Sequence, residues 1–141
     1  MAFSGEYQHS IDEKGRLIIP AKFRDSLGNR YMLSKGLEAC LFAYPMEAWA
    51  RLEEKLNQLN GFNRRNRDFI RRFYSGAGEC EVDKQGRTLI NQEFRGYGNL
   101  TKELYIVGAG DHLEIWDKEA WEGYRDGLDV DYESLAEEIF Q

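Results

Sequence analysis

Apolar and polar positions follow the same order in two separate blocks of the chain. In each block a short apolar or β-branched run, at 16–19 and at 87–90, is predicted to be a strand. A second pair of strands follows, at 31–34 with 41–44 and at 104–107 with 113–116. Apolar residues then recur at helical spacing, so a helix is expected to close each block. The pattern predicts a mainly β fold with short helices.

The helices are expected to turn apolar stripes toward the core. These stripes are Met46, Trp49, Leu52, Leu56 and Leu59 in the first block, and Trp121, Tyr124 and Leu128 in the second. Shorter helices follow the first strands: Pro20 suits a first helical position, Asn91 suits an N-cap, and Phe23 and Phe94 are expected to point inward. A further helix is predicted over 63–74. It has Phe62, Phe69, Ile70 and Phe73 on one side and Arg64, Arg65, Arg67, Arg71 and Arg72 around the rest.

The two blocks are copies of one another. Residues 11–24 align with 82–95 without a gap, and six positions are identical: Asp12/Asp83, Gly15/Gly86, Arg16/Arg87, Ile19/Ile90, Phe23/Phe94 and Arg24/Arg95. Such self-similarity indicates a tandem repeat. The chain therefore divides into a first repeat at 1–61, an arginine-rich connecting helix at 62–74, a second repeat at 75–128 and an acidic tail at 129–141.

Each copy contains the motif Asp-x-x-Gly-Arg. Asp at the first position and Gly at the fourth suit a type I turn followed by a left-handed residue, which is a common hairpin connection with a bulge. One interpretation is that each Asp only caps its turn and pairs with the Arg, a contact of little energetic value when exposed. Turn chemistry explains the Asp and the Gly, but it does not require the Arg.

The recurring arginine suggests contact with nucleic acid. An Arg at a projecting tip can contact phosphate or read guanine in the major groove, and a neighbouring Asp can hold the guanidinium in one orientation. The candidate DNA-binding residues are Asp12, Lys14 and Arg16 in the first turn, and Asp83, Lys84 and Arg87 in the second. The first turn is expected to be the better DNA contact, because Gln85 stands where the first copy has Lys14.

The distribution of charge is compatible with such a partner, although the net charge of −6 is not. Eleven acidic residues and two basic ones lie between Asp111 and Gln141, so the rest of the chain is mildly basic. The acidic tail can be read as a solvated helix face. The arginines at 64–72 can be a solvated face, a link to the acidic tail of another subunit, or a DNA contact.

Other functional classes find little support in the residues. His9 and His112 belong to no paired motif, and Cys40 and Cys80 lack C-x-x-C spacing, so neither a catalytic site nor a metal site is expected. No phosphate-binding glycine motif or nucleophile elbow occurs, and no cofactor is expected. No apolar run reaches the length of a membrane span, and the first residues do not resemble a signal peptide. We expect a cytoplasmic protein that is not an enzyme.

The doubled motif resembles the MraZ family of bacterial transcriptional regulators. The first copy, residues 12–24, is also similar to the swapped-hairpin DNA-binding modules of the AbrB type. The resemblance covers nearly the whole chain in order, and single AbrB-like modules would carry the motif once.

The resemblance implies a double-split β-barrel built from two tandem AbrB-like repeats. It also implies a ring homo-oligomer, associated with the nucleoid, that binds tandem G-rich boxes in double-stranded promoter DNA. Such a ring represses the division and cell-wall gene cluster, which includes its own gene. Arg16 and Asp12, with Arg87 and Asp83, take the places of the family's paired motif residues. The alternative is an antitoxin-like or other AbrB-type protein-interaction module with secondary DNA contact.

Overall fold

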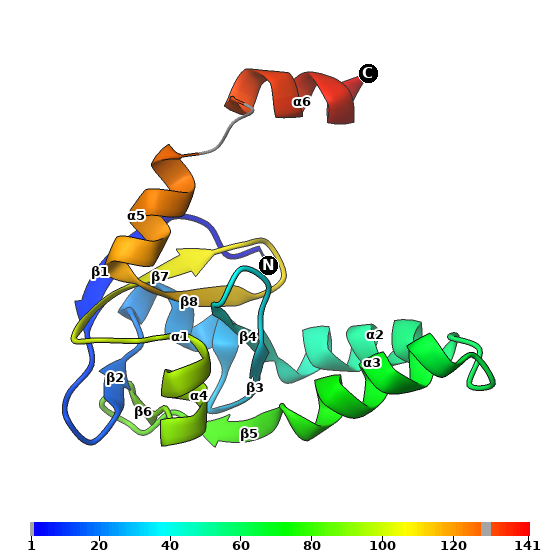
Figure 1. Ribbon diagram of the computed structural model, residues 1–141. Helices are drawn as coiled ribbons and strands as arrows, with labels where there is room; N and C mark the ends of the chain where they lie inside the picture. Colours follow the sequence, from blue (N-terminus) through cyan, green and yellow to red (C-terminus); the bar gives the residue numbers. More distant parts are fainter. Residues whose placement is uncertain (1, 128–130) are drawn as a thin grey trace.

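The strands of the two repeats pair with each other. The computed structural model describes residues 2–127 and 131–141, with strands gathered in two antiparallel sheets (Figure 1). The larger sheet has the order β1-β7-β8-β4-β3-β5 and the smaller one is β2-β6. The strands are β1 (Glu6–Ser10), β2 (Arg16–Ile18), β3 (Arg30–Lys35), β4 (Leu41–Pro45), β5 (Gly78–Glu81), β6 (Arg87–Leu89), β7 (Glu103–Gly108) and β8 (Leu113–Asp117).

Helices lie around these strands. They are α1 (Ala21–Leu27), α2 (Met46–Asn57), α3 (Arg64–Ser75), α4 (Gln92–Tyr97), α5 (Lys118–Asp126) and α6 (Tyr132–Phe140). The mainly β core with short helices, built from two repeats, agrees with the prediction, as do the hairpins β3–β4 and β7–β8. The strand order of the large sheet reflects the repeat. β1 of the first repeat pairs with β7 of the second, and the equivalent strand β5 of the second repeat pairs with β3 of the first.

The strands on either side of each Asp-x-x-Gly-Arg turn pair for a shorter distance than expected. Each turn closes a short hairpin, with the Asp12 N–H donating to the Arg16 carbonyl (3.0 Å) and the Asp83 N–H to the Arg87 carbonyl (2.9 Å), but the pairing ends at the single bridges Ile11–Leu17 and Val82–Thr88. Beyond these bridges β1 pairs with β7, and β2 pairs with β6 of the other repeat. A three-residue hairpin alone is only marginally stable, whereas the exchange buries Leu17 and Thr88 inside the molecule.

A buried hydrogen bond joins the two sheets. Tyr31 on β3 and Thr88 on β6 are both almost inaccessible to solvent, and their hydroxyl oxygens lie 2.7 Å apart. Burial raises the pKa of Tyr31, so this phenol stays neutral. Phe23 of α1 fills the core beside Phe3 and Tyr7, with edge-to-face ring contacts at 5.6 and 5.2 Å. The small sheet is therefore fixed firmly to the large one.

The short helices begin close to their predicted positions. Asn91 caps α4, since its side chain accepts a hydrogen bond from the backbone N–H of Phe94. Pro20 lies one position earlier than expected, at the N-cap of α1, where its missing N–H costs nothing. Phe23 is buried and Phe94 packs, half-buried, against the same core.

Helices α2 and α3 form a projection that we call the arm, residues 46–75 (Figure 1). The predicted central helix is confirmed as α3, which Asn63 caps by accepting from the backbone N–H groups of Arg65 and Asn66. Trp49 stacks on Phe73 with ring centroids 5.3 Å apart, and the Tyr74 hydroxyl donates to Glu53. These contacts hold the base of the arm together.

The predicted apolar stripes are only partly buried. Trp49 and Leu56 are buried, but Met46, Leu59 and Tyr124 are exposed, and Leu59 lies beyond the end of α2. These helices contact the sheets along the rim, so a helical stripe can extend past the surface that covers it. Trp121 and Tyr124 instead pack on Trp116, with ring centroids 5.2 and 5.0 Å away. Leu128 lies outside the described residues.

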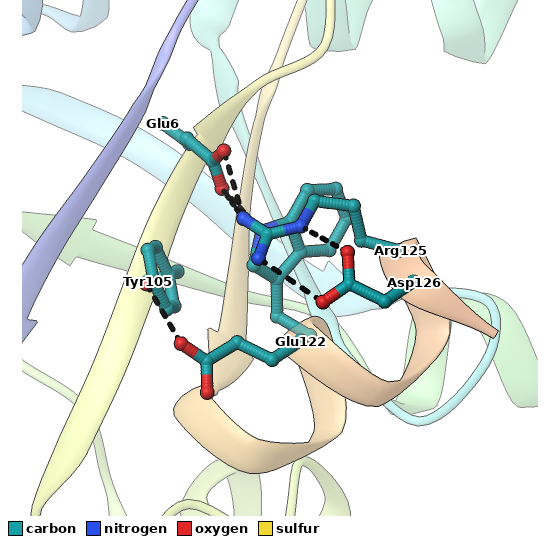
Figure 2. A network of polar contacts seen from close by, with 6 residues as sticks. Glu6, Tyr105, Glu122, Arg125 and Asp126 are labelled. Atoms are coloured by element: carbon teal, nitrogen blue, oxygen red, sulfur yellow. Dashed lines mark hydrogen bonds and ion pairs between the residues drawn. The ribbon is translucent and has the colours of Figure 1, made fainter. Parts of the chain in front are cut away.

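A polar network fixes α5 to the edge of the large sheet (Figure 2). Arg125 donates to the Glu6 carboxylate of β1 at 3.0 Å and to Asp126 of its own helix, while the Tyr105 hydroxyl donates to Glu122 at 3.0 Å. Trp121 also donates its indole N–H to Glu6. Hydrogen bonds to Arg125 hold the pKa of Asp126 below its usual range, so that carboxylate stays charged.

In the part of the chain that is described, none of the helices has the length and apolar character needed to cross a bilayer.

His112 is expected to make the stability depend on pH. Its ring lies between Asp111 (2.7 Å) and Glu114 (3.2 Å) and stacks on Tyr44. Burial opposes the charged ring, but the two carboxylates outweigh it and raise the pKa of His112 above 6.5. The stabilisation that the charged His112 ring gives the folded protein is therefore complete below about pH 6.5. It is lost as the pH rises through the raised pKa of His112. Urea unfolding of the wild type and His112→Gln from about pH 5.5 to 8.5 tests this. An equal pH dependence in both proteins would contradict it.

Candidate nucleic-acid interface

The first Asp-x-x-Gly-Arg turn is organised by one carboxylate. Asp12 Oδ1 accepts from the backbone N–H groups of Lys14 (2.9 Å) and Arg16 (2.8 Å), and Oδ2 accepts from Arg16 Nε at 2.8 Å. Backbone hydrogen bonds, assisted by the Arg16 guanidinium, lower the pKa of Asp12, so the carboxylate is charged at neutral pH. Gly15 closes the turn with φ of 88°, which is the left-handed region.

The second turn repeats this geometry. Asp83 Oδ1 accepts from the backbone of Gln85 and Arg87, and Oδ2 accepts from Arg87 Nε, all at 2.9 Å. Backbone hydrogen bonds likewise lower the pKa of Asp83, and Gly86 has φ of 82°. The repeat thus preserves a hydrogen-bonding pattern that reaches beyond the turn to the guanidinium.

The aspartate orients the arginine without contributing much stability. Both ion pairs are exposed, with 47% of the Arg16 side chain accessible, and exposed pairs add little to stability. Each pair uses the Nε side of the guanidinium. Across residues 2–127 and 131–141, Arg16 has no further protein acceptor, whereas a terminal amino group of Arg87 lies 3.5 Å from Gln85 Oε1. Arg16 therefore presents its terminal amino groups to solvent in a fixed position.

The small sheet brings the two motifs together. In its antiparallel register Arg16 lies opposite Leu89 and Ile18 opposite Arg87, with Leu17 and Thr88 between them. Since successive side chains alternate across a strand, Leu17 and Thr88 are buried while the other four side chains are exposed on the opposite face. We call this face the ribbon; it consists of Arg16, Ile18, Arg87 and Leu89. The sequence predicts two separate tips and does not reveal this shared surface.

Arg24 and Arg95 also match between the repeats, and the structure gives them a role that the sequence alone does not indicate. Arg24 donates from Nε to the Ile19 carbonyl at 2.8 Å, and Arg95 donates to the Ile90 carbonyl at 3.0 Å. Each guanidinium covers the turn glycine of the other repeat: a Cβ added at Gly86 would overlap Arg24, and one at Gly15 would meet Arg95. The signal was available in the sequence, because these arginines recur in step with Arg16 and Arg87.

The remaining candidate residues lie at or away from these turns. Lys14 and Lys84 are exposed at the turns, as expected of phosphate contacts. Glu79 and Glu81 of β5 line the same hollow as both Arg16 and Arg87, and Glu79 is paired with Arg30 at 2.7 Å. The arginines at 64–72 belong to the arm, and Figure 1 places them away from the ribbon strands β2 and β6. The structure therefore separates the two basic candidates.

The cysteines lie in different surroundings. Cys40 is buried and donates from Sγ to the Leu37 carbonyl, and burial raises the pKa of this thiol to about 12. Burial also raises the pKa of Cys80. Among the described residues, no three His, Cys, Asp or Glu side chains converge to hold a metal ion.

Comparisons with known proteins agree with the duplicated geometry. The family described as "MraZ protein, putative antitoxin-like" matches the chain twice, at residues 2–72 and 73–141. Relatives named "Transcriptional regulator MraZ" include one from Pelotomaculum thermopropionicum, 53% identical over 97% of this chain and 94% of its own length. Another, from Acetivibrio thermocellus, is 51% identical over 97% of this chain and 96% of its own length. This chain therefore belongs to the MraZ family.

Proposed function

We propose that this protein is a sequence-specific DNA-binding transcriptional regulator. The observation that carries the proposal is the ribbon, on which two arginines are held in the same geometry by two aspartates. A guanidinium fixed in this way loses less conformational freedom on binding and can pair with the two acceptors of guanine. The naming of its relatives as transcriptional regulators supports the same function.

Within this proposal the residues have different roles. Arg16 reads a base edge, Asp12 orients Arg16, and Lys14 contacts phosphate. Arg87, Asp83 and Lys84 make the equivalent but weaker contacts, since Arg87 also approaches Gln85, which stands where the first turn has Lys14. A two-stranded ribbon is narrow enough to enter the major groove.

The proposed assembly is a ring. The fold is proposed to be a double-split β-barrel. The proposed target is a set of tandem G-rich boxes upstream of the division and cell-wall genes. The protein represses these genes together with its own gene. We propose a cytoplasmic, nucleoid-associated protein.

One ribbon binds weakly, but several ribbons on repeated boxes act at high effective concentration. This accounts for DNA binding by a chain whose net charge is −6.

Arg16→Ala is expected to weaken binding to tandem G-rich boxes by about 1–3 kcal/mol per contact, or roughly 5- to 150-fold. Titration of labelled duplex at one fixed salt concentration measures this effect, because phosphate contacts make affinity salt-dependent. Lys22→Ala is the control, since it also removes one positive charge, from an exposed position on α1 that lies outside the ribbon and the arm. Equal affinities of Arg16→Ala and wild type would contradict the assignment of Arg16.

The antitoxin-like alternative is favoured by one feature, the exposed apolar stripe of α6. It predicts that the protein purified from its own cells carries a second, different polypeptide. Promoter binding by the purified chain alone, with no such polypeptide, would reject this alternative.

A further inference from the structure

Two helices of this chain expose apolar side chains that the fold leaves uncovered. Neither α3 nor α6 contains a buried residue. On the arm, Phe62 is 94% exposed and Phe69 is 52% exposed. On α6, Tyr132, Leu135, Ile139 and Phe140 are all exposed, the last at 84%. Apolar side chains gathered in this way usually mark an interaction site.

The apolar residues of α6 form one face. Tyr132, Leu135, Ala136, Ile139 and Phe140 occur at intervals of three and four residues, which places them along one side of the helix. A nine-residue helix is marginal in water unless its apolar face packs against something. Since α6 contributes no buried side chain, its stability calls for a partner surface outside its own fold.

The two surfaces have opposite charges. Helix α3 carries five arginines and one acidic residue, Asp68, whereas α6 carries Glu133, Glu137 and Glu138 and no basic residue. Such complementarity steers association and fixes the register of a contact. Apart from a long Arg64–Asp68 pair at 3.9 Å, no ion pair is seen for the α3 arginines among the described residues.

Charged and apolar side chains also alternate in a matching way. On α3, Phe69 has Arg65 four residues before it and Arg72 three residues after it, so both lie beside it on the helix surface. On α6, Phe140 has Glu137 three residues before it. Helix α6 can therefore place its apolar face against Phe62 and Phe69 while its glutamates meet these arginines.

We propose that α6 of one copy docks on the arm of a neighbouring copy. Within one chain the two surfaces lie apart: α6 follows α5 at the top of Figure 1, while the arm extends from the strands toward the right, below α6. Each copy then receives the α6 of one neighbour on its arm and places its own α6 on the arm of the other neighbour. This is a heterologous contact of the kind that closes rings. The inference rests on the ring proposed above and names the surfaces that build it.

The proposal is tested on the full chain without DNA, by native mass measurement over a range of protein concentration. The arm reversal Arg65→Glu/Arg72→Glu and the α6 reversal Glu137→Lys/Glu138→Lys should each raise the concentration needed for assembly by at least about tenfold. The combination of all four changes should restore assembly. The control Lys22→Glu/Lys102→Glu makes the same charge change as the arm reversal at exposed residues elsewhere and should assemble normally.

Cross-linking identifies which copy supplies the helix. A mixture of Phe69→Cys chains and Ile139→Cys chains should give a disulfide-linked dimer that contains one of each, and neither variant alone should give it. Unchanged assembly of the reversed variants, failure of the combination to restore it, or absence of the mixed 69–139 dimer would overturn the proposal. If the arm reversal assembles normally but no longer binds DNA, the arginines contact DNA and the inference is wrong, while the proposed function stands. Normal docking without any DNA binding would instead reject the proposed function.

Discussion

Replacing Gly86 by alanine is expected to lower the free energy of unfolding by about 2–4 kcal/mol. Gly86 has φ of 82°, where a residue with a Cβ is strained by about 1–2 kcal/mol. The added Cβ would also overlap the Arg24 guanidinium, which donates to the Ile19 carbonyl at 2.8 Å. Displacing Arg24 breaks this hydrogen bond, at a further cost of about 1–2 kcal/mol. Urea unfolding at one fixed protein concentration measures the sum.

Two companion variants separate these causes. Gly96→Ala is the matched control, because Gly96 lies in α4 and an added Cβ there meets no other atom within 4 Å; it should be neutral or slightly stabilising. In an Arg24→Ala background the overlap is absent, so Gly86→Ala should cost only the backbone strain. Additive effects of Arg24→Ala and Gly86→Ala would show that the guanidinium does not constrain this turn.

The part of the fold that the sequence predicts is its local part. Hairpins β3–β4 and β7–β8 and helix α3 follow from periodicity and caps, since the deciding contacts are close in the sequence. The exchange of strands between repeats does not follow. β2 shows the same apolar pattern whether its partner is β1 or β6, and only the three-dimensional burial of Leu17 and Thr88 selects β6.

The same limit applies to the candidate site. The repeat singled out Asp12, Arg16, Asp83 and Arg87, and the structure holds each Asp–Arg pair in the same geometry. The repeat in the sequence does not show that these residues share one ribbon, because their adjacency depends on a pairing across 71 residues of sequence. The exposure of Phe62 and Phe69 was also out of reach, since a helical stripe does not reveal whether the surface that covers it belongs to the same chain.

Leu17→Ala and Ile18→Ala should differ sharply, although they are neighbours on one three-residue strand. Leu17 is 0% exposed and faces the core, so its truncation should cost about 2–5 kcal/mol through lost burial and a cavity. Ile18 is 46% exposed on the ribbon, so its truncation should change stability by less than about 1 kcal/mol. Urea unfolding of both variants at equal protein concentration tests the difference.

Measuring the DNA affinity of Leu17→Ala and Ile18→Ala tests the ribbon directly. Leu17→Ala chains that remain folded still present Arg16 and Arg87, so their affinity should change little once the folded fraction is taken into account. Ile18 lies opposite Arg87 on the proposed contact face, so Ile18→Ala should weaken binding to DNA without unfolding the protein. The reverse result, a stable Leu17→Ala and an unfolded Ile18→Ala, would mean that the strand presents its other face and that Arg16 points into the protein. Because a shift of one residue exchanges the two faces of a strand, these two substitutions test the register on which the whole interface depends.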